Sequence, residues 1–326
     1  MLDKNFPLYI TAFIISLTLT FLIEKRLIPL LKRCAKQPIY EEGPKWHKSK
    51  DGTPTMGGLA FLIAISVSIT VCAIFITEER KLIFSLLSCQ IFAILNSAVG
   101  IIDDLKKLKR KKNKGLSAGG KLLLQLLLAT AFLFARSAFI GDTPDAAFSF
   151  GDIYLGYAYY PIALFILLGI VNCANLTDGI DGLASSVAFA VGVSLLYISA
   201  ALNPEVALVS SALIGGTVGF LIFNLHPAKI FMGDTGSLYL GALIAATSIS
   251  LDNPILIIFI CGVYVLEGYS VILQVFWFKA FKKRIFKMSP IHHHLEQCGW
   301  SENKICIVAI IFTFIFSIPA YMLYLP

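Results

Sequence analysis

Long apolar runs constrain this chain more than any other feature. Ten stretches carry almost no charge, and they are close to the roughly 20 residues that a helix needs to cross a bilayer. Outer-membrane barrel strands alternate in hydrophobicity over about ten residues, so they do not explain such runs. We therefore predict an all-α integral membrane protein with ten transmembrane helices, at Phe6–Ile23, Gly57–Thr77, Leu82–Ile102, Leu122–Ile140, Tyr159–Ala174, Leu183–Leu202, Val206–Phe223, Ser237–Leu251, Pro254–Phe278 and Ile305–Leu325.

Composition supports this class. Apolar residues make up 57% of the 326 positions and charged residues 14%, against about 45–50% and about 25% in soluble domains. A soluble enzyme, a disordered chain and a disulfide scaffold are thereby excluded. The seven cysteines form no C-x-x-C pair, so we expect no zinc site. Without repeats or linkers, we expect residues 1–326 to form a single membrane domain.

Lysine and arginine are concentrated between alternate runs. If both termini lie outside the cell, 23 of the 27 basic residues fall on the cytoplasmic face, as the positive-inside rule favours. The net charge of +7 then belongs to a membrane face that attracts anionic lipids and substrates, and it requires no nucleic acid.

Ionisable side chains collect on this predicted cytoplasmic face. They include all five histidines and the aspartates at 103, 104, 178, 181 and 234. A channel or transporter would more often place charges near mid-bilayer, where only Glu267 and Gln274 of the ninth run are suggestive. The distribution favours an active site at the cytoplasmic membrane surface.

Adjacent carboxylates, Asp103 and Asp104, close the third run just before a basic stretch. Such a pair suits Mg²⁺, which prefers oxygen ligands, or proton abstraction. Plain solvation of acids at the end of a span is the alternative. An isoprenoid-synthase site is disfavoured because the third acid of that motif is missing.

A turn with two Asp-Gly pairs, NLTDGIDGLA, covers Asn175–Ala184. Its glycines allow backbone N–H groups to approach an anion, and the next helix directs its positive end to the same place. An ordinary helix connection is the alternative. A CDP-alcohol phosphotransferase would need an arginine where Ala184 and Ser185 stand.

The segment FNLHPAKIFMGDTGS covers Phe223–Ser237. Asn224 offers an amide for a base or sugar edge, Phe231 offers a ring that can stack on a base, and Asp234 is a carboxylate at a helix start. The plainer explanations are a membrane-interface anchor for Phe231 and an N-cap for Asp234.

Three adjacent histidines stand in PIHHHLEQCGW, Pro290–Trp300. Zinc is disfavoured because no spaced partners accompany them, and we expect one or two of them to bind phosphate. Before the second run, Lys48 and Lys50 precede TPTMGG, where they could steer a pyrophosphate. A solvated positive-inside charge is the alternative for each lysine.

These motifs together, in this order and with the GLSA that follows the basic loop, resemble the polyprenyl-phosphate N-acetylhexosamine-1-phosphate transferase superfamily. The last motif, from His292 to Trp300, is similar to the phospho-N-acetylmuramoyl-pentapeptide transferase branch. The GlcNAc-1-phosphate branch typically carries an arginine among its histidines, and it remains the alternative within the superfamily.

The resemblance implies ten helices with extracytoplasmic termini in a bacterial cytoplasmic membrane. A homodimer is one of the oligomeric states that such a protein could adopt. It implies Mg²⁺-dependent transfer of phospho-MurNAc-pentapeptide from UDP-MurNAc-pentapeptide to undecaprenyl phosphate. Asp234 would be the Mg²⁺ ligand, with Asp103 and Asp104 beside the diphosphate and His292 at phosphate or sugar. The residues assigned to substrate binding are Lys50, Lys121, Asn175, Asp178, Asp181, Asn224, Phe231, His293 and His294. Among them, Asp181, Asn224 and Phe231 would surround the uridine.

Two mechanisms stay open from the sequence. The lipid phosphate is already a nucleophile near neutral pH, so a one-step in-line attack suffices physically, because phosphoryl transfer mainly needs positioning and charge neutralisation. The competing route passes through a covalent intermediate on Asp103 or Asp104.

Overall fold

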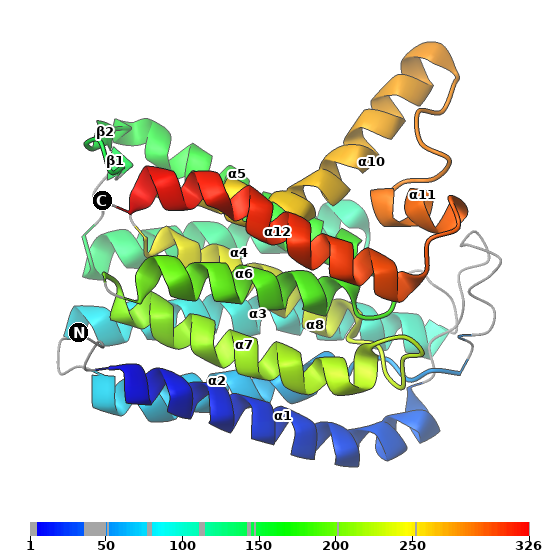
Figure 1. Cartoon of the computed structure of the whole chain (residues 1–326), viewed down its shortest axis with the longest axis horizontal. Helices are drawn as coiled ribbons and strands as arrows, with labels where there is room; N and C mark the ends of the chain where they lie inside the picture. The colour runs from blue at the N-terminus through cyan, green and yellow to red at the C-terminus, as the bar shows by residue number, and fades with distance from the viewer. Residues whose placement is uncertain are drawn as a thin grey trace.

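The apolar runs form a bundle of helices whose axes lie roughly side by side (Figure 1). The computed structural model describes residues 5–35, 50, 52–76, 80–110, 115–141, 145–146, 148–200, 202–251 and 253–325. Its helices are α1 (Phe6–Cys34), α2 (Gly58–Ile76), α3 (Arg80–Arg110), α4 (Ala118–Phe139), α5 (Tyr159–Thr177), α6 (Leu183–Ser199), α7 (Pro204–Asn224), α8 (Gly233–Ile249), α9 (Leu256–Ile260), α10 (Gly262–Phe281), α11 (Ile291–Gln297) and α12 (Glu302–Tyr324).

Each of the ten predicted runs contains a helix. Seven of the described helices are long and apolar enough to cross a membrane, namely α1, α2, α3, α4, α5, α7 and α12. Helix α6 is a shorter apolar helix of 17 residues, and α8, which has Asp234 in its first turn, also has 17. The ninth predicted run is divided at Cys261 into α9 and α10, and α10 leaves the bundle at an angle (Figure 1).

Two helices continue past the charges that were expected to end them. Helix α1 runs through Glu24, which is buried, while Lys25 and Arg26 are exposed. Helix α3 continues eight residues beyond the predicted limit at Ile102, so Asp103 and Asp104 lie within it rather than at its end. The physical reason is that these acids are buried against neighbouring helices instead of being solvated.

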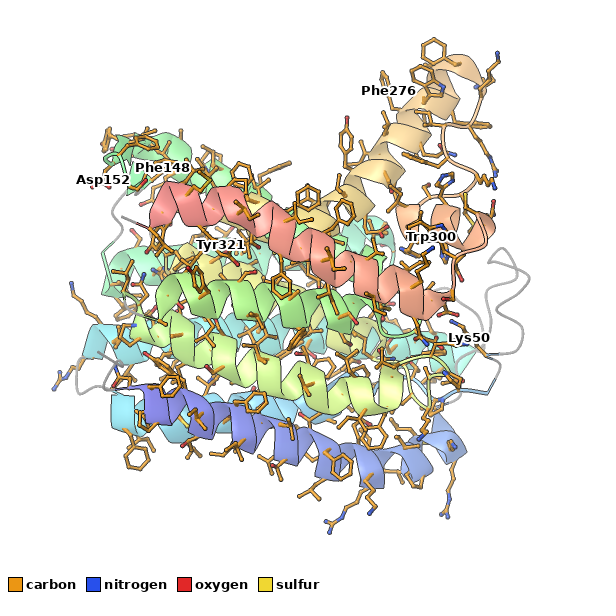
Figure 2. All side chains as sticks on the ribbon, in the orientation of Figure 1. Lys50, Phe148, Asp152, Phe276, Trp300 and Tyr321 are labelled. Carbon is orange, nitrogen blue, oxygen red and sulfur yellow. The ribbon has the colours of Figure 1, made fainter. Side chains whose placement is uncertain are left out.

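Both chain termini lie at one end of the bundle, and Lys50 and Trp300 lie at the opposite end (Figures 1 and 2). The end with the termini carries a small antiparallel hairpin in which β1 (Asp145–Ala146) pairs with β2 (Ile153–Tyr154). Phe148 and Asp152 mark this end in Figure 2.

Helix α8 is the centre of the bundle. Every residue from Thr235 to Ile249 is buried, and α3, α5 and α2 pack around it. Glycines make the closest of these approaches. A Cβ atom on Gly58 would collide with the backbone of Gly236, and one on Gly100 would collide with the backbone of Asp234 and Thr235. The approach at Gly100 brings the next turn of α3 to the N-terminus of α8.

We expect Gly100→Ala to lower the melting temperature in detergent and the activity together. The new methyl group has no room beside the Asp234 backbone, and overpacking of this kind costs about 1–3 kcal/mol. Gly119→Ala is the matched control, because nothing lies within 4 Å of a Cβ atom there and alanine is the better helix former. Equal melting temperatures for the two variants would contradict the tight α3–α8 contact.

Candidate functional site

Three carboxylates meet where α3 crosses the start of α8. We call Asp103, Asp104 and Asp234 the aspartate cluster. Each offers one oxygen atom, and these three atoms lie within 4.8 Å of one another. Asp103 and Asp104 are buried, and Asp234 is partly buried in the first turn of α8. The sequence separates Asp234 from the pair by 130 residues, and the close approach at Gly100 brings them together.

Asp104 caps helix α8 from outside that helix. Its Oδ1 accepts the backbone N–H of Asp234 at 3.2 Å. Its Oδ2 accepts the backbone N–H of Thr235 at 2.9 Å and the Thr235 hydroxyl at 2.7 Å. The first N–H groups of a helix have no partner within it and carry partial positive charge, so a carboxylate is a favourable cap. Both oxygens of Asp104 are therefore engaged in the structure.

Two lysines balance the charge of the other two aspartates. Lys107 Nζ lies 2.7 Å from Asp103 Oδ2 and 3.1 Å from Asp234 Oδ2. Lys121 Nζ lies 2.8 Å from that same Asp234 oxygen and donates to Asn175 Oδ1 at 3.1 Å. The expected residues Lys121, Asn175 and Asp234 are thus in direct contact, whereas Lys107 was not expected.

Asn175 completes this side of the site. Its Nδ2 donates to Asp234 Oδ1 at 3.0 Å and to Ser237 Oγ at 2.8 Å. Because one amide contacts both Asp234 and Lys121, the end of α5 fixes the Asp234 side chain relative to α4 and α8. The remaining Asp103 oxygen accepts the backbone N–H of Leu116.

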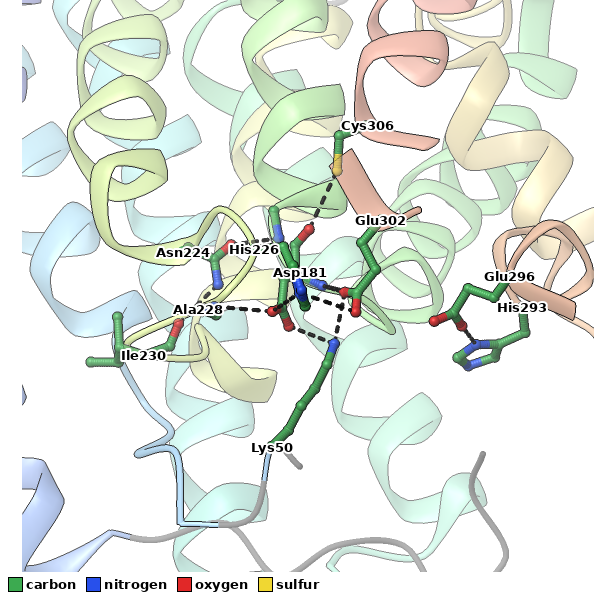
Figure 3. A network of polar contacts seen from close by, with 11 residues as sticks. Lys50, Asp181, Asn224, His226, Ala228, Ile230, His293, Glu296, Glu302 and Cys306 are labelled. Carbon is green, nitrogen blue, oxygen red and sulfur yellow. Dashed lines mark hydrogen bonds and ion pairs between the residues drawn. The ribbon is translucent and has the colours of Figure 1, made fainter. Parts of the chain in front are cut away.

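A second group, the Lys50 cluster, consists of Lys50, Asp181, His226 and Glu302 (Figure 3). Lys50 Nζ contacts Asp181 Oδ1 at 2.6 Å and Glu302 Oε2 at 2.7 Å. His226 Nδ1 lies 3.0 Å from Asp181 Oδ2 and 3.3 Å from Glu302 Oε1. Asp181 also accepts the backbone N–H of Ala228 at 3.0 Å. Four segments distant in sequence are joined here by ion pairs.

Asn224 and Phe231 hold the loop between α7 and α8. Asn224 Oδ1 accepts the N–H of Gly182 at 3.2 Å, and its Nδ2 donates to the Ile230 carbonyl at 2.9 Å. The backbone of Phe231 is paired at both its N–H and its carbonyl with residues 54–57, and its ring is partly exposed. The loop that carries Asp234 is therefore anchored on both sides.

The three adjacent histidines have different surroundings. His292 is fully buried, and its Nδ1 lies 3.1 Å from Glu267 Oε2 of α10. His293 Nδ1 lies 2.6 Å from Glu296 Oε2 in the same short helix, α11. His294 Nδ1 accepts the N–H of Lys287 at 3.2 Å. His47, singled out with them in the sequence, lies outside the described residues, as does Lys48.

One turn connects all these groups. The DGIDG turn, residues 178–182, follows α5. Gly179 at its start lies against the His292 ring, and Asp181 belongs to the Lys50 cluster. Removal from water, and then the negative charges of Asp234 and Asp104, raise the pKa of Asp178 well above its usual range. Asp178 can therefore hold a proton more readily than an ordinary aspartate can.

A pocket of about 640 Å³ opens beside the Lys50 cluster. His226, Trp300 and Glu302 line it, together with Lys287 and Gln297. Lys304 Nζ lies 4.1 Å from the centroid of the Trp300 ring. The volume is in the range of sites that bind small molecules and cofactors.

Six residues contact the predicted site residues but were not assigned to the site from the sequence. They are Lys107, His226, Thr235, Ser237, Glu267 and Glu302. Lys107 carried a usable signal, because it lies one helical turn after Asp103. Glu302 and Glu267 gave none for this role, since nothing local in the sequence places them beside Lys50 and His292.

Known proteins resemble this chain along most of its length. The model of glycosyl transferase family 4 matches residues 85–252, and a phospho-N-acetylmuramoyl-pentapeptide-transferase signature matches residues 50–62. A protein named phospho-N-acetylmuramoyl-pentapeptide-transferase in Clostridium perfringens (strain SM101) is 42% identical over 97% of this chain and 96% of its own. Proteins of the same name are 41% identical in Caldicellulosiruptor bescii, over 95% and 96%, and 44% identical in Halalkalibacterium halodurans, over 90% of each chain.

We expect Glu302→Gln to lower the melting temperature in detergent. The carboxylate accepts from Lys50 and from the backbone N–H of Asp181 at 2.7 Å, and hydrogen bonds to charged groups each contribute about 1.5–3 kcal/mol. Asp152→Asn, on the exposed hairpin, is the control, because it removes a carboxylate that makes no such contact with the described part of the chain. The idea fails if both variants melt at the wild-type temperature.

Proposed function

The chain belongs to the phospho-N-acetylmuramoyl-pentapeptide transferase family, and we propose that the aspartate cluster is the centre at which it acts. The enzyme transfers phospho-MurNAc-pentapeptide from UDP-MurNAc-pentapeptide to undecaprenyl phosphate. The products are lipid I, a precursor of peptidoglycan, and UMP. The observation that carries the proposal is the meeting of Asp103, Asp104 and Asp234 with two lysines at the N-terminus of α8.

The donor set of the cluster fits Mg²⁺. This ion prefers oxygen ligands and is typically bound by one or two carboxylates together with substrate phosphates. Both oxygens of Asp104 are already engaged by α8, and Asp103 accepts from Leu116 and pairs with Lys107. Asp234 is the carboxylate best placed to hold the ion, because its partners are side chains that can move. Bound Mg²⁺ would neutralise charge on the diphosphate.

Lysines and helix ends supply the rest of the charge neutralisation. Lys107 and Lys121 surround Asp234 and can attract the diphosphate oxygens of the nucleotide sugar. The N-terminus of α8 faces the same place. We place Asn175 and Asp178 as supports of this centre, because the first contacts Asp234 and the second lies within its field.

The uridine would bind on the side of the Lys50 cluster. There, Asp181, Asn224 and Phe231 lie on connected loops, and the pocket beside His226 and Glu302 leaves room for part of the nucleotide sugar. Lys50 would meet an anionic part of the substrate. We assign His292, His293 and His294 to the phosphate or sugar.

The engagement of the two adjacent carboxylates favours a one-step reaction. All four oxygens of Asp103 and Asp104 accept a hydrogen bond or pair with a lysine. A covalent route would need one of them to leave these partners and attack phosphorus. The phosphate of undecaprenyl phosphate can attack directly, so the enzyme needs to align it with the diphosphate and to stabilise the charge.

We also propose the orientation in the membrane. The end with Lys50 and Trp300 would face the cytoplasm, and the end with both termini would face outward (Figure 2). Then α6, α8 and the α9–α10 pair complete ten crossings with the seven long helices. The location is the bacterial cytoplasmic membrane, where the lipid carrier and the soluble nucleotide sugar meet. We also propose that the protein forms a homodimer, which measurements of its oligomeric state in solution would test.

The reaction itself is tested with purified protein, UDP-MurNAc-pentapeptide, undecaprenyl phosphate and Mg²⁺, and with released UMP as the readout. We expect Asp234→Asn to abolish UMP release, because an amide is a poor Mg²⁺ ligand. Circular dichroism should show that the variant stays folded, although its melting temperature falls with the loss of the pairing to Lys107 and Lys121. Asp152→Asn is the matched control and should turn over normally. UDP-GlcNAc in place of the muramoyl substrate tests the other branch of the superfamily. Near-normal turnover of Asp234→Asn at ordinary Mg²⁺ would remove Asp234 from the metal site.

Labelled UMP distinguishes the two mechanisms. In protein stripped of endogenous lipid, we expect no exchange of labelled UMP into UDP-MurNAc-pentapeptide, because a one-step attack requires the lipid phosphate. Adding undecaprenyl phosphate should start exchange, since one phosphoanhydride replaces another and the equilibrium constant lies near one. Lipid-free exchange at the rate of turnover would establish the covalent route instead.

A further inference from the structure

We propose that Glu267 is a positioning residue for the transfer reaction. Its carboxylate holds the imidazole of His292 so that the other ring nitrogen, Nε2, is directed at the DGIDG turn, where it can donate a hydrogen bond to a substrate phosphate. This inference rests on the proposed function, because it concerns the substrate of the same site. The two ideas are nevertheless separable by experiment.

Two contacts join Glu267 to His292, and both residues are shielded from water. Glu267 Oε2 lies 3.1 Å from His292 Nδ1, and the same oxygen accepts the backbone N–H of His292 at 3.3 Å. Glu267 is 3% exposed and His292 is fully buried. Water therefore cannot replace the carboxylate as the partner of Nδ1, and the ring is fixed by a charged group in a water-excluded environment.

The opposite edge of the ring is unpaired. His292 Nε2 is a buried polar atom with no hydrogen-bond partner among the described residues. It lies against Gly179, close enough that a Cβ atom at that position would collide with it. Buried polar atoms are nearly always hydrogen-bonded, and an exception needs an explanation. A ligand that binds at the DGIDG turn and accepts from Nε2 provides one.

Three elements converge to make this arrangement. Helix α10 carries Glu267 and packs on α5, with Gly268 against Cys173. The end of α5 leads directly into Asp178 and Gly179, and α11 carries His292. Glu267 lies in the first two turns of α10, the helix that leaves the bundle at an angle (Figure 1). The Glu267 carboxylate on α10 can thus act, through the His292 ring, on a substrate phosphate that binds at the DGIDG turn.

Chemistry explains why the partner is a carboxylate. An ionised carboxylate only accepts hydrogen bonds, so Nδ1 must carry a proton. When the ring is protonated, both nitrogens carry a hydrogen, and Nε2–H is then a charge-assisted donor to phosphate. Such a donor would add a partner for an anionic substrate at the DGIDG turn, apart from the lysines that pair with Asp103 and Asp234. A glutamine at position 267 keeps the shape but can also donate to Nδ1, and it carries no charge.

Kinetics test the inference through a double-mutant cycle. We expect Glu267→Gln to lower kcat by about 10- to 100-fold, the loss typical when the partner that orients an active histidine is removed. In a His292→Asn background the same change should alter kcat by less than about twofold, because its effect passes through the histidine. Tyr269→Phe, an exposed neighbour on α10, is the control for the helix. Independent, multiplying losses in the double variant would overturn the inference.

Nitrogen NMR tests the arrangement without requiring activity. The chain has only five histidines, so ¹⁵N-histidine labelling gives few signals, and His292→Asn assigns the one that matters. We expect wild-type Nδ1 of His292 to be protonated and this signal to change in Glu267→Gln. Glu296→Gln, which removes the carboxylate beside His293, should leave the His292 signal in place.

The outcomes separate the two ideas. A neutral His292 with its proton on Nε2 alone, or a signal that ignores Glu267→Gln, would refute the positioning role even in an active enzyme. Conversely, a wild-type protein that releases no UMP would contradict the proposed reaction, while the nitrogen spectrum would still decide whether Glu267 fixes the ring.

Discussion

The DGIDG turn is the structural element on which the rest of the site depends. Its backbone and side chains are held by Asn224 at Gly182 and by Glu302 and Lys50 at Asp181. Gly182 has a φ of +79°, a conformation that glycine adopts without the steric cost of a side chain. From this one turn, Asp178 lies within the field of Asp234 and Asp104, and Gly179 leaves space for His292. A shift of this turn would therefore change the positions of the Lys50 cluster and the His292 ring relative to the aspartate cluster.

The charges of the site are arranged as two separate groups of ion pairs. Lys107 and Lys121 face Asp103 and Asp234, whereas Lys50 is shared between Asp181 and Glu302. Each group lies at a helix end or one turn within a helix, so it is tied to backbone dipoles as well as to side chains. This arrangement lets a doubly anionic substrate replace some internal ion pairs with contacts of its own, instead of facing unpaired negative charge.

The sequence was informative where the physics is local. Apolar runs predicted a helix at each of ten places, because burial in lipid requires helical backbone. The motifs also named Lys121, Asn175 and Asp234, which the structure places in direct contact. The predicted ends of α1 and α3 were wrong, because Glu24, Asp103 and Asp104 are buried by tertiary contacts that no local pattern reveals. Glu302 and Glu267 were not anticipated as partners of Lys50 and His292 for the same reason: their partners lie 252 and 25 residues away in sequence.

The burial of α8 on all sides has a consequence for how the enzyme is made. Ribosomal synthesis delivers α2, α3 and α5 before α8, and Glu267, His292 and Glu302 only after it. Helix α8 therefore packs between helices that have been synthesised before it, and Asp104 is made before the backbone that it caps. In a nascent chain that ends before α8, the acids of α3 therefore lack the helix N-terminus whose partial positive charge Asp104 contacts in the finished protein. The order of translation delays assembly of the complete centre until the last helix has been made.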